Sequence, residues 1–584
     1  MVTPRTGDLP RWLVRDWIAG GALFVATAAV VLWQNAHVAV LWDLSYVLDS
    51  AARIAAGQVP YRQFPFAHSP LTFLLQAAMI RLTGRVYFHH VVYVALIGGL
   101  GTVITWRIAL RALRGRVVAA WPVALLTVAP LSVLGIYCIL PNPEYDCDCA
   151  FWILVAVWLL QRLDVRQKSV MNGLVAGALA CLPLFFKQNM GLPFLVAVAA
   201  AIAALIAFRT VRPSADIRND KQIRAHLGAV IGIAAALSAA VLVLHWTCGL
   251  RHYIHWTILF AAQRRMPAWR EMLSVYRERS LLWALPCVVT ALIFLRTWIG
   301  RQKWGRLVAF LLLAAPFLFM LSSLLLYDDA DERGDALLAI WPLLLILASV
   351  LALRNLFRLR RDPDMRTLLP LILLVAINGT MMSQQLWGSS YAVWPLLILL
   401  VAEMLAFLES IAANSGVAHR LTPVLAALIA VTFLICGGFY TASEERLSYA
   451  KFPDTPVQHS AFPQLAGMAT PGPYLPEFDE LLRYANTNIP INDGLILLPG
   501  EDPFYFATGR VPRFPVLLFD PTTNPYTPGQ IASLAGTLNI RWLIVKRDLQ
   551  LVADPMPAGA ATLQALLPRF TLAAHLHGYD VYRR

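Results

Sequence analysis

The chain has 584 residues, of which 58% are hydrophobic and only 14% are charged. Soluble proteins are about half apolar and about a quarter charged, so the composition excludes an ordinary soluble enzyme and indicates a membrane protein. The formal net charge of +14 does not require a nucleic-acid partner, because most basic residues fall in short loops where they orient membrane helices.

The apolar residues are grouped into runs long enough to cross about 30 Å of hydrocarbon as helices. They do not alternate as barrel strands do, and only helices or closed barrels can span lipid. We therefore expect a polytopic α-helical membrane protein with about thirteen transmembrane helices. The expected spans are residues 17–35, 87–106, 117–137, 148–162, 170–186, 191–208, 227–247, 280–298, 307–326, 336–353, 367–380, 391–409 and 421–440.

The loops between these spans carry an orientation signal. Basic residues gather in every second loop, beginning with the N-terminus, and such loops favour the cytoplasmic side. The first run has no small-residue cleavage site after it, so it predicts an anchor and not a cleaved signal. We expect a cytoplasmic N-terminus and an external segment after the last span. The basic loops are residues 107–116, 162–168, 209–224, 296–306 and 354–366.

The pattern predicts two domains, a transmembrane domain over residues 1–440 and an extracytoplasmic domain over residues 441–584. The transmembrane domain contains a long first outer loop, residues 36–86, in which an apolar stretch at 71–82 predicts an interfacial helix. The second domain alternates helical patterns with short apolar strands, which is typical of a small α/β domain. Helices are expected at 477–486, 529–538 and 560–567, and strands at 494–498, 516–519, 541–545 and 572–582.

Acidic residues are rare in the spans and gather in two outer loops. Asp43 follows the first span and is placed to cap a helix over residues 44–56. Glu144, Asp146 and Asp148 lie in the second outer loop, where solvated loop acids are the simpler interpretation of Glu144 and Asp148. Because both loops meet the membrane on the same face, Asp43 and one acid of the second loop can converge at one site.

Several cations are expected on the same face. A carboxylate activates a nucleophile by taking its proton, and cations stabilise a phosphate leaving group, so acids and cations together suit sugar transfer from a lipid phosphate. The simpler interpretations are an extended lysine at a span end and arginines that anchor lipid head groups. The candidate cations are Arg62, His68, Lys187, the Arg264–Arg265 pair and Arg333.

Four segments resemble the GT-C superfamily of polyprenyl-phosphate-sugar glycosyltransferases, which includes the lipid A aminoarabinose transferases and protein O-mannosyltransferases. Together they cover about the first 210 residues. They are Asp43 with residues 51–61 (AARIAAGQVPY), residues 66–71 (FAHSPL), residues 145–152 (YDCDCAFW) and residues 185–191 (FFKQNMG).

The resemblance implies an inverting hexosyl- or pentosyltransferase in a bacterial inner membrane. It implies a polyprenyl-phosphate sugar donor, contact with membrane lipid, and an extracytoplasmic acceptor that is a glycan, a lipid or a protein. The C-terminal domain would be periplasmic, either a structural cover over the active site or a binding domain.

The resemblance also implies roles for individual residues. Asp43 matches the first-loop acid, which acts as base or orients the acceptor. Asp146 best matches the second acid, with Asp148 as the alternative. Lys187 and His68 match positions near the donor phosphate.

We include Arg62, Asp148 and Arg333 among the expected substrate-binding residues. Two departures from the family, Leu44 after Asp43 and histidine at position 68, leave the sugar, the acceptor and the use of a divalent metal open. No metal site is predicted, because the Cys147–Cys149 spacing is wrong for a zinc knuckle.

Two other classes of function remain. A transporter or flippase of lipid-linked saccharide would place ionisable residues inside its spans, whereas here the acids cluster in outer loops, with Glu403 as an exception. A non-catalytic subunit of a glycan-assembly system would use the same scaffold. The position of the acids favours an enzyme over a transporter.

Overall fold

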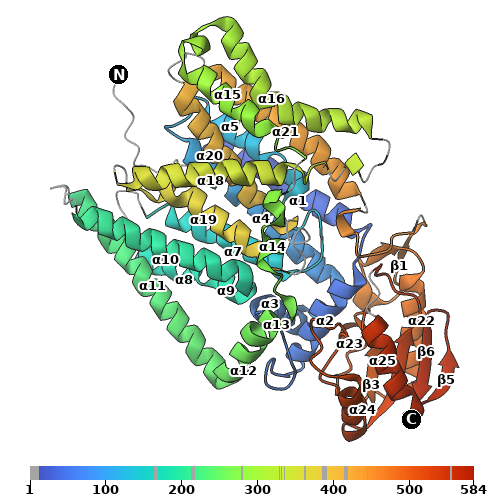
Figure 1. Ribbon diagram of the computed structural model, residues 1–584. Helices are drawn as coiled ribbons and strands as arrows, with labels where there is room; N and C mark the ends of the chain where they lie inside the picture. The colour runs from blue at the N-terminus through green and yellow to red at the C-terminus, as the bar shows by residue number, and fades with distance from the viewer. Residues whose placement is uncertain are drawn as a thin grey trace.

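The structure is a computed structural model in which a helical body carries a smaller sheet-containing domain at one end (Figure 1). It describes residues 12–163, 169–211, 217–277, 280–327, 329, 332–333, 336–360, 363–383, 391–412, 418–443, 445–453, 455–552 and 556–584.

Eight helices of the described residues are long and apolar enough to cross a membrane. Many of their outward-facing side chains are large and hydrophobic, as on α11, which is the arrangement expected where lipid replaces water. The chain is therefore a multi-pass helical membrane protein. These helices are α1 (Val14–Asn35), α4 (Tyr87–Leu113), α10 (Gln188–Val211), α11 (Ile217–Thr247), α16 (Lys303–Leu326), α18 (Ile340–Leu359), α20 (Trp394–Ala412) and α21 (Ala418–Ala442).

The other five expected spans correspond to shorter or interrupted helices, so the structure confirms the helical class but not the count of thirteen spans. The third expected span is broken before Pro130, and the fifth is broken at Cys181. These segments are α5 (Ala120–Val128) with α6 (Leu131–Leu134), α7 (Tyr145–Leu160), α8 (Val170–Ala180) with α9 (Leu182–Phe186), α15 (Ala284–Arg296) and α19 (Met365–Thr380).

Glycines allow α8 and α11 to pack with their backbones almost in contact. A Cβ atom on Gly173 would lie 2.0 Å from the carbonyl oxygen of Ala225, and one on Gly177 would lie 2.0 Å from that of Ala229. Small residues at such spacing are typical of close helix pairs in membranes. The α8–α11 pair therefore depends on the absence of side chains at these two positions.

The first outer loop forms two helices, α2 (Leu41–Ala55) and α3 (Leu71–Thr83). Both were expected, but α2 begins before Asp43, so the interpretation of Asp43 as a helix cap is wrong. The residue that precedes the helix is Val40, which provides no side-chain cap, and Asp43 lies in the first turn.

The C-terminal domain contains a four-stranded sheet of order β3-β4-β6-β5, in which β3 and β4 are parallel and the other pairs antiparallel. The expected strand at 516–519 is irregular, and the expected strand at 572–582 is a hairpin. The strands are β3 (Gly494–Leu498), β4 (Ile540–Lys546), β5 (Thr571–His575) and β6 (Tyr579–Arg583), with β1 (Val457–His459) paired to β2 (Ala469–Pro471) apart from them. The helices are α22 (Tyr474–Asn488), α23 (Phe504–Thr508), α24 (Pro528–Thr537) and α25 (Met556–Leu566).

The first outer loop and the C-terminal domain share one hydrophobic core. Leu44, Val47 and Leu48 of α2 belong to the same buried cluster as Phe504 and Ile544 of the C-terminal domain. Figure 1 shows α2 beside α23 at the junction of the helical body with the sheet domain. The boundary expected near residue 440 therefore separates two parts of the chain that pack as one body.

Polar contacts place the ends of distant helices on one face of the helical body. The Gln34 side chain, at the end of α1, donates to the carbonyl of Thr441 at the end of α21 over 2.5 Å. Asn35 donates to the carbonyl of Pro141, just before α7, over 2.9 Å. The loop after α1, the segment before α7 and the start of the C-terminal domain therefore lie side by side.

Candidate active site

Asp43 lies in the first turn of α2, inside the protein but with part of its surface exposed. Its Oδ2 accepts a 2.5 Å hydrogen bond from the hydroxyl of Tyr449. Burial raises the pKa of Asp43 to about 6, against the opposing effect of the Tyr449 hydrogen bond; the charge of Asp146 raises it further and that of Arg265 lowers it. A carboxyl group with this pKa can exchange a proton near neutral pH.

Two acids of the second outer loop belong to the same electrostatic cluster. Asp146, in the first turn of α7, is buried, and so is Glu144, which precedes that helix. Burial and the charges of Asp43 and Asp146 raise the pKa of Glu144 well above its usual value. The interpretation of Glu144 as a solvated loop acid is therefore wrong.

Asp148 is also buried, but three hydroxyl groups occupy its carboxylate. Thr72 of α3, Tyr93 of α4 and Tyr137 each donate a 2.7 Å hydrogen bond to it. The solvated-acid interpretation is wrong here too. These bonds tie Asp148 to its neighbours, whereas the charge of Asp146 acts on Asp43.

Lys187 lies at the break between α9 and α10, where its backbone is extended. The break turns its side chain toward α7, and its ammonium forms an ion pair with the Asp146 carboxylate. The same ammonium lies 5.3 Å from the centre of the Tyr145 ring. Lys187 is thus inside the acidic cluster and does not extend into lipid head groups.

His68 also contacts Tyr145, with the two ring centres 4.4 Å apart. Its Nδ1 is 2.6 Å from the hydroxyl of Tyr46. Burial, together with the charges of Arg265 and Lys187, lowers the pKa of His68 well below its usual value. His68 is therefore a neutral hydrogen-bonding group at pH 7 and not a cation.

The two arginines that end α13 (Ala261–Arg265) point to different places. Arg264 is exposed and donates to the carbonyl of Pro521 over 3.2 Å. Arg265 is partly exposed and acts electrostatically on Asp43, His68 and Tyr145. The sequence suggested the pair as candidates, and the structure brings only Arg265 to the acids.

Two further candidates lie apart from this cluster. Arg62 is on the exposed surface of the first outer loop. Arg333 donates to the carbonyl of Tyr327 over 2.7 Å, and its guanidinium lies 6.0 Å from the centre of the Phe439 ring. In the described part of the chain, neither arginine contacts Asp43 or Asp146.

The described residues contain no group of three or more His, Cys, Asp or Glu side chains arranged to hold a metal ion. Asp146 is already engaged by Lys187. Among the cations suggested by the sequence, Arg265 and Lys187 are the ones that the structure brings to these acids.

Tyr449 is the site residue that sequence reasoning missed. It lies after the last span, in a segment with no recognisable motif, and reaches Asp43 from 406 residues away. Nothing in the local sequence marks it, because its position depends on how the C-terminal domain packs on α2.

The sequence matches no family model and no curated protein. Solved structures with a similar arrangement include ArnT from Cupriavidus metallidurans bound to undecaprenyl phosphate, at 12% identity over 98% of each chain and a TM-score of 0.47. Another is AglB, an oligosaccharyltransferase from Archaeoglobus fulgidus, in complex with an inhibitory peptide and a dolichol-phosphate. Its identity is 11%, over 92% of this chain and 70% of that chain, with a TM-score of 0.43. At these values the similarity by itself assigns neither a family nor an activity to this chain.

Proposed function

We propose that the protein is an integral membrane glycosyltransferase. It would transfer a sugar from a polyprenyl-phosphate-linked donor to an acceptor outside the cytoplasm. The observation that carries this proposal is the position of Asp43, a carboxyl group with a pKa of about 6, beside Arg265 and the buried Asp146–Lys187 pair. The resemblance of four segments to polyprenyl-phosphate-sugar transferases points to the same chemistry.

The reaction needs a base and a stabilised leaving group. Asp43 would take the proton of the acceptor nucleophile as that atom attacks the anomeric carbon of the sugar. The bond between this carbon and the phosphate oxygen breaks, and the polyprenyl phosphate leaves with the electron pair. Attack from the side opposite the phosphate inverts the anomeric centre.

The cations would stabilise the negative charge that develops on the phosphate. Arg265 is partly exposed and so able to meet a ligand, while Asp146 holds Lys187 in the site. The neutral ring of His68 would add a hydrogen bond. Arg62 and Arg333 lie apart from this cluster, and a role for them in substrate binding would require a substrate that extends beyond it.

The charges inside the helical body give little support to a transporter. Glu403 of α20 forms an ion pair with Arg116 at 2.7 Å. Asp16, near the start of α1, accepts a 2.8 Å hydrogen bond from Trp121. Both acids are paired within the protein, whereas transporters keep ionisable groups available to a substrate near the midplane. The acids of the proposed site lie outside the long spans, in the first turns of α2 and α7.

The test compares envelope glycans and lipids, by mass spectrometry, in cells that lack the protein and in the same cells complemented with variants. We expect Asp43→Asn to behave as the deletion does, with loss of one sugar modification and accumulation of its lipid-linked donor. Asp49→Asn is the matched control, because Asp49 lies on the same helix but is held by the backbone of Phe506. It should complement fully.

A flippase defect would also make the donor accumulate, so the purified protein is tested next. Incubated with the accumulated lipid and envelope acceptor, it should release polyprenyl phosphate, and Asp43→Asn should not. Full complementation by Asp43→Asn, or no release by the wild-type protein, would refute the proposed function.

A further inference from the structure

The C-terminal domain supplies a hydrogen-bond donor to the proposed catalytic acid. The hydroxyl of Tyr449 reaches Oδ2 of Asp43 from the segment that joins α21 to β1. Tyr449 is partly buried, and its ring packs beside Trp42, Leu518 and Leu551. The direction of this hydroxyl therefore depends on the backbone around residue 449.

That backbone is paired with another segment of the C-terminal domain. The carbonyl of Tyr449 accepts a 2.8 Å hydrogen bond from the amide of Val552. Ala450 and Leu551 form an antiparallel bridge, and the amide of Lys451 donates to the carbonyl of Gln550. Residues 449–451 thus lie where residues 550–552 place them.

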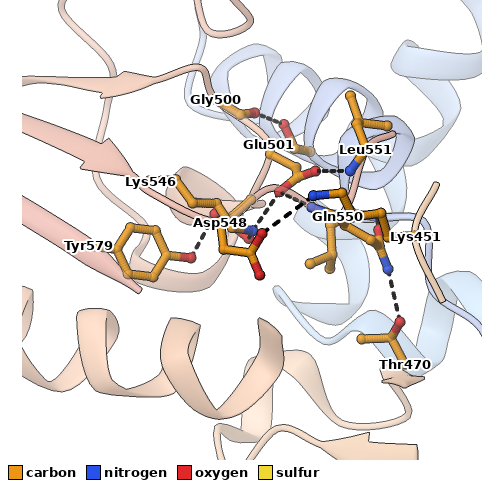
Figure 2. A network of polar contacts seen from close by, with 12 residues as sticks. Lys451, Thr470, Gly500, Glu501, Lys546, Asp548, Gln550, Leu551 and Tyr579 are labelled. Carbon is orange, nitrogen blue, oxygen red and sulfur yellow. Dashed lines mark hydrogen bonds and ion pairs between the residues drawn. The ribbon is translucent and has the colours of Figure 1, made fainter. Parts of the chain in front are cut away.

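A buried carboxylate fixes this second segment (Figure 2). The amides of Gln550 and Leu551 each donate a 3.1 Å hydrogen bond to Glu501. The ammonium of Lys546 lies 2.6 Å from Glu501 and 2.8 Å from Asp502. Tyr579 donates a 2.8 Å hydrogen bond to Asp502.

All three charged groups of this cluster are almost fully buried. Removing charges from water is costly, and replacing such a cluster with apolar residues is often neutral or stabilising. A buried cluster of this kind is therefore weak evidence for a role in stability alone. What the cluster does fix is the 550–552 segment, through the two amide hydrogen bonds that Glu501 accepts.

The same segment also holds the helix that carries Asp43. The Gln550 side chain accepts a 2.8 Å hydrogen bond from the amide of Leu41, the first residue of α2, and donates to the carbonyl of Ala39 over 2.9 Å. Ser45 of α2 donates to the carbonyl of Gly500, next to Glu501. Asp43 and its hydrogen-bond donor are thus fixed to one cluster.

We propose that Tyr449 is a positioning residue for Asp43. The buried Glu501–Lys546–Asp502 cluster in the C-terminal domain sets the position of Tyr449. This inference rests on the proposed function for the role of Asp43. The C-terminal domain then takes part in the active site and does not only cover it.

The Tyr449 hydroxyl stabilises the ionised form of Asp43 and so opposes the effect of burial. The charges of Asp146 and Arg265 also act on Asp43, and Asp43 in turn acts on Glu144 and Tyr145. Replacement of Tyr449 by phenylalanine leaves all of these in place. The variant therefore isolates one hydrogen bond.

The first test is the pH dependence of sugar transfer by the purified full-length protein. In Tyr449→Phe we expect the acidic limb of the rate profile to move to higher pH by about one unit, because the variant loses the hydrogen bond that stabilises the ionised carboxylate of Asp43. Glu501→Gln should move it in the same direction. Added to Tyr449→Phe, Glu501→Gln should move it by less than it does in the wild-type protein, because the Tyr449 hydrogen bond is already absent.

Asp493→Asn is the matched control in the same domain. Asp493 accepts a 3.0 Å hydrogen bond from the indole of Trp542 on β4, but it has no part in the cluster around Glu501. Its substitution should lower the stability of the domain without moving the acidic limb. An unchanged limb in Tyr449→Phe, or an equal shift in Asp493→Asn, would overturn the inference.

A second measurement does not depend on transfer activity. Hydrogen–deuterium exchange of the amides of residues 41–45 should be faster in Glu501→Gln than in the wild-type protein, and unchanged in Asp493→Asn. If exchange responds as expected but no transfer occurs in the wild-type protein, the proposed function fails and the structural connection stands. Exchange that is unchanged in Glu501→Gln refutes the connection itself.

Discussion

Lys187 and Asp146 form an ion pair in which the two side chains are only 8% and 3% exposed. The lysine comes from the break between α9 and α10 and the aspartate from the first turn of α7. The pair joins two helix ends beside Asp43, so it is a structural connection, and in the proposed function its ammonium would also act on the donor phosphate.

Single substitutions of this pair should destabilise the protein strongly. Lys187→Met or Asp146→Asn leaves a buried group without its partner, and such changes cost about 3 to 5 kcal/mol. The double variant should recover much of the thermal stability, measured in detergent, yet stay inactive in sugar transfer. Recovery of transfer in the double variant would remove Lys187 and Asp146 from the mechanism.

The rate of transfer should depend on the ionisation of Asp43. A base must be deprotonated to act, and the pKa of Asp43 is about 6. The rate should therefore be low at pH 5 and rise through about pH 6 toward a plateau. The measurement is the initial rate of release of polyprenyl phosphate at fixed donor concentration. A rate that is flat from pH 5 to 7 would show that another group takes the proton.

The stability of the protein should have a separate pH dependence that originates at Asp49. Burial raises the pKa of this carboxyl to about 8, in spite of hydrogen bonds from the backbone of α23. The folded state then keeps a proton that the unfolded chain releases near pH 4. Its contribution to stability is complete below about pH 4 and is lost as the pH rises toward 8, by at most about 1.4 kcal/mol per unit.

Asp49→Asn retains an acceptor for the Phe506 amide and removes the titration. The variant should therefore lose less thermal stability than the wild-type protein between pH 5 and 8. Melting curves in detergent at several pH values measure this difference. Parallel curves for the two proteins would mean that Asp49 is not protonated in the folded state.

The α8–α11 contact should be sensitive to a single methyl group. Gly177→Ala would place a Cβ 2.0 Å from the backbone oxygen of Ala229, and overpacking of this kind costs about 1 to 3 kcal/mol. Gly21→Ala is the control, because a Cβ there meets nothing within 4 Å. We expect a lower melting temperature for the first variant only. Equal melting temperatures would show that the two helices can separate without cost.

The helical class and the two acidic loops could be predicted because each depends on local composition. Apolar runs indicate membrane helices wherever they occur. The acidic residues of the two loops can be recognised because they lie outside these runs. The expected spans that the structure interrupts are those with a local break, as before Pro130 and at Cys181.

The predictions for Asp43 and Asp148 were wrong because residues distant in the sequence supply the hydrogen bonds at these positions. Asp43 is not a cap because Gln550, 509 residues away, accepts the hydrogen bond of the Leu41 amide at the start of α2. Asp148 is buried because hydroxyls from α3, α4 and Tyr137 surround it. Such partners are known only after the chain has folded, so capping rules and loop composition could not reveal them.

The dependence of residues 41–45 on Glu501 and Gln550 also bears on how the protein is made. Synthesis proceeds from the N-terminus, so every apolar helix can enter the membrane before the segment that holds α2 exists. The nascent chain would then contain both acids and their cations but lack the contacts that fix Asp43. The proposed active site would therefore be complete only after residues 501–552 have been synthesised and packed against α2.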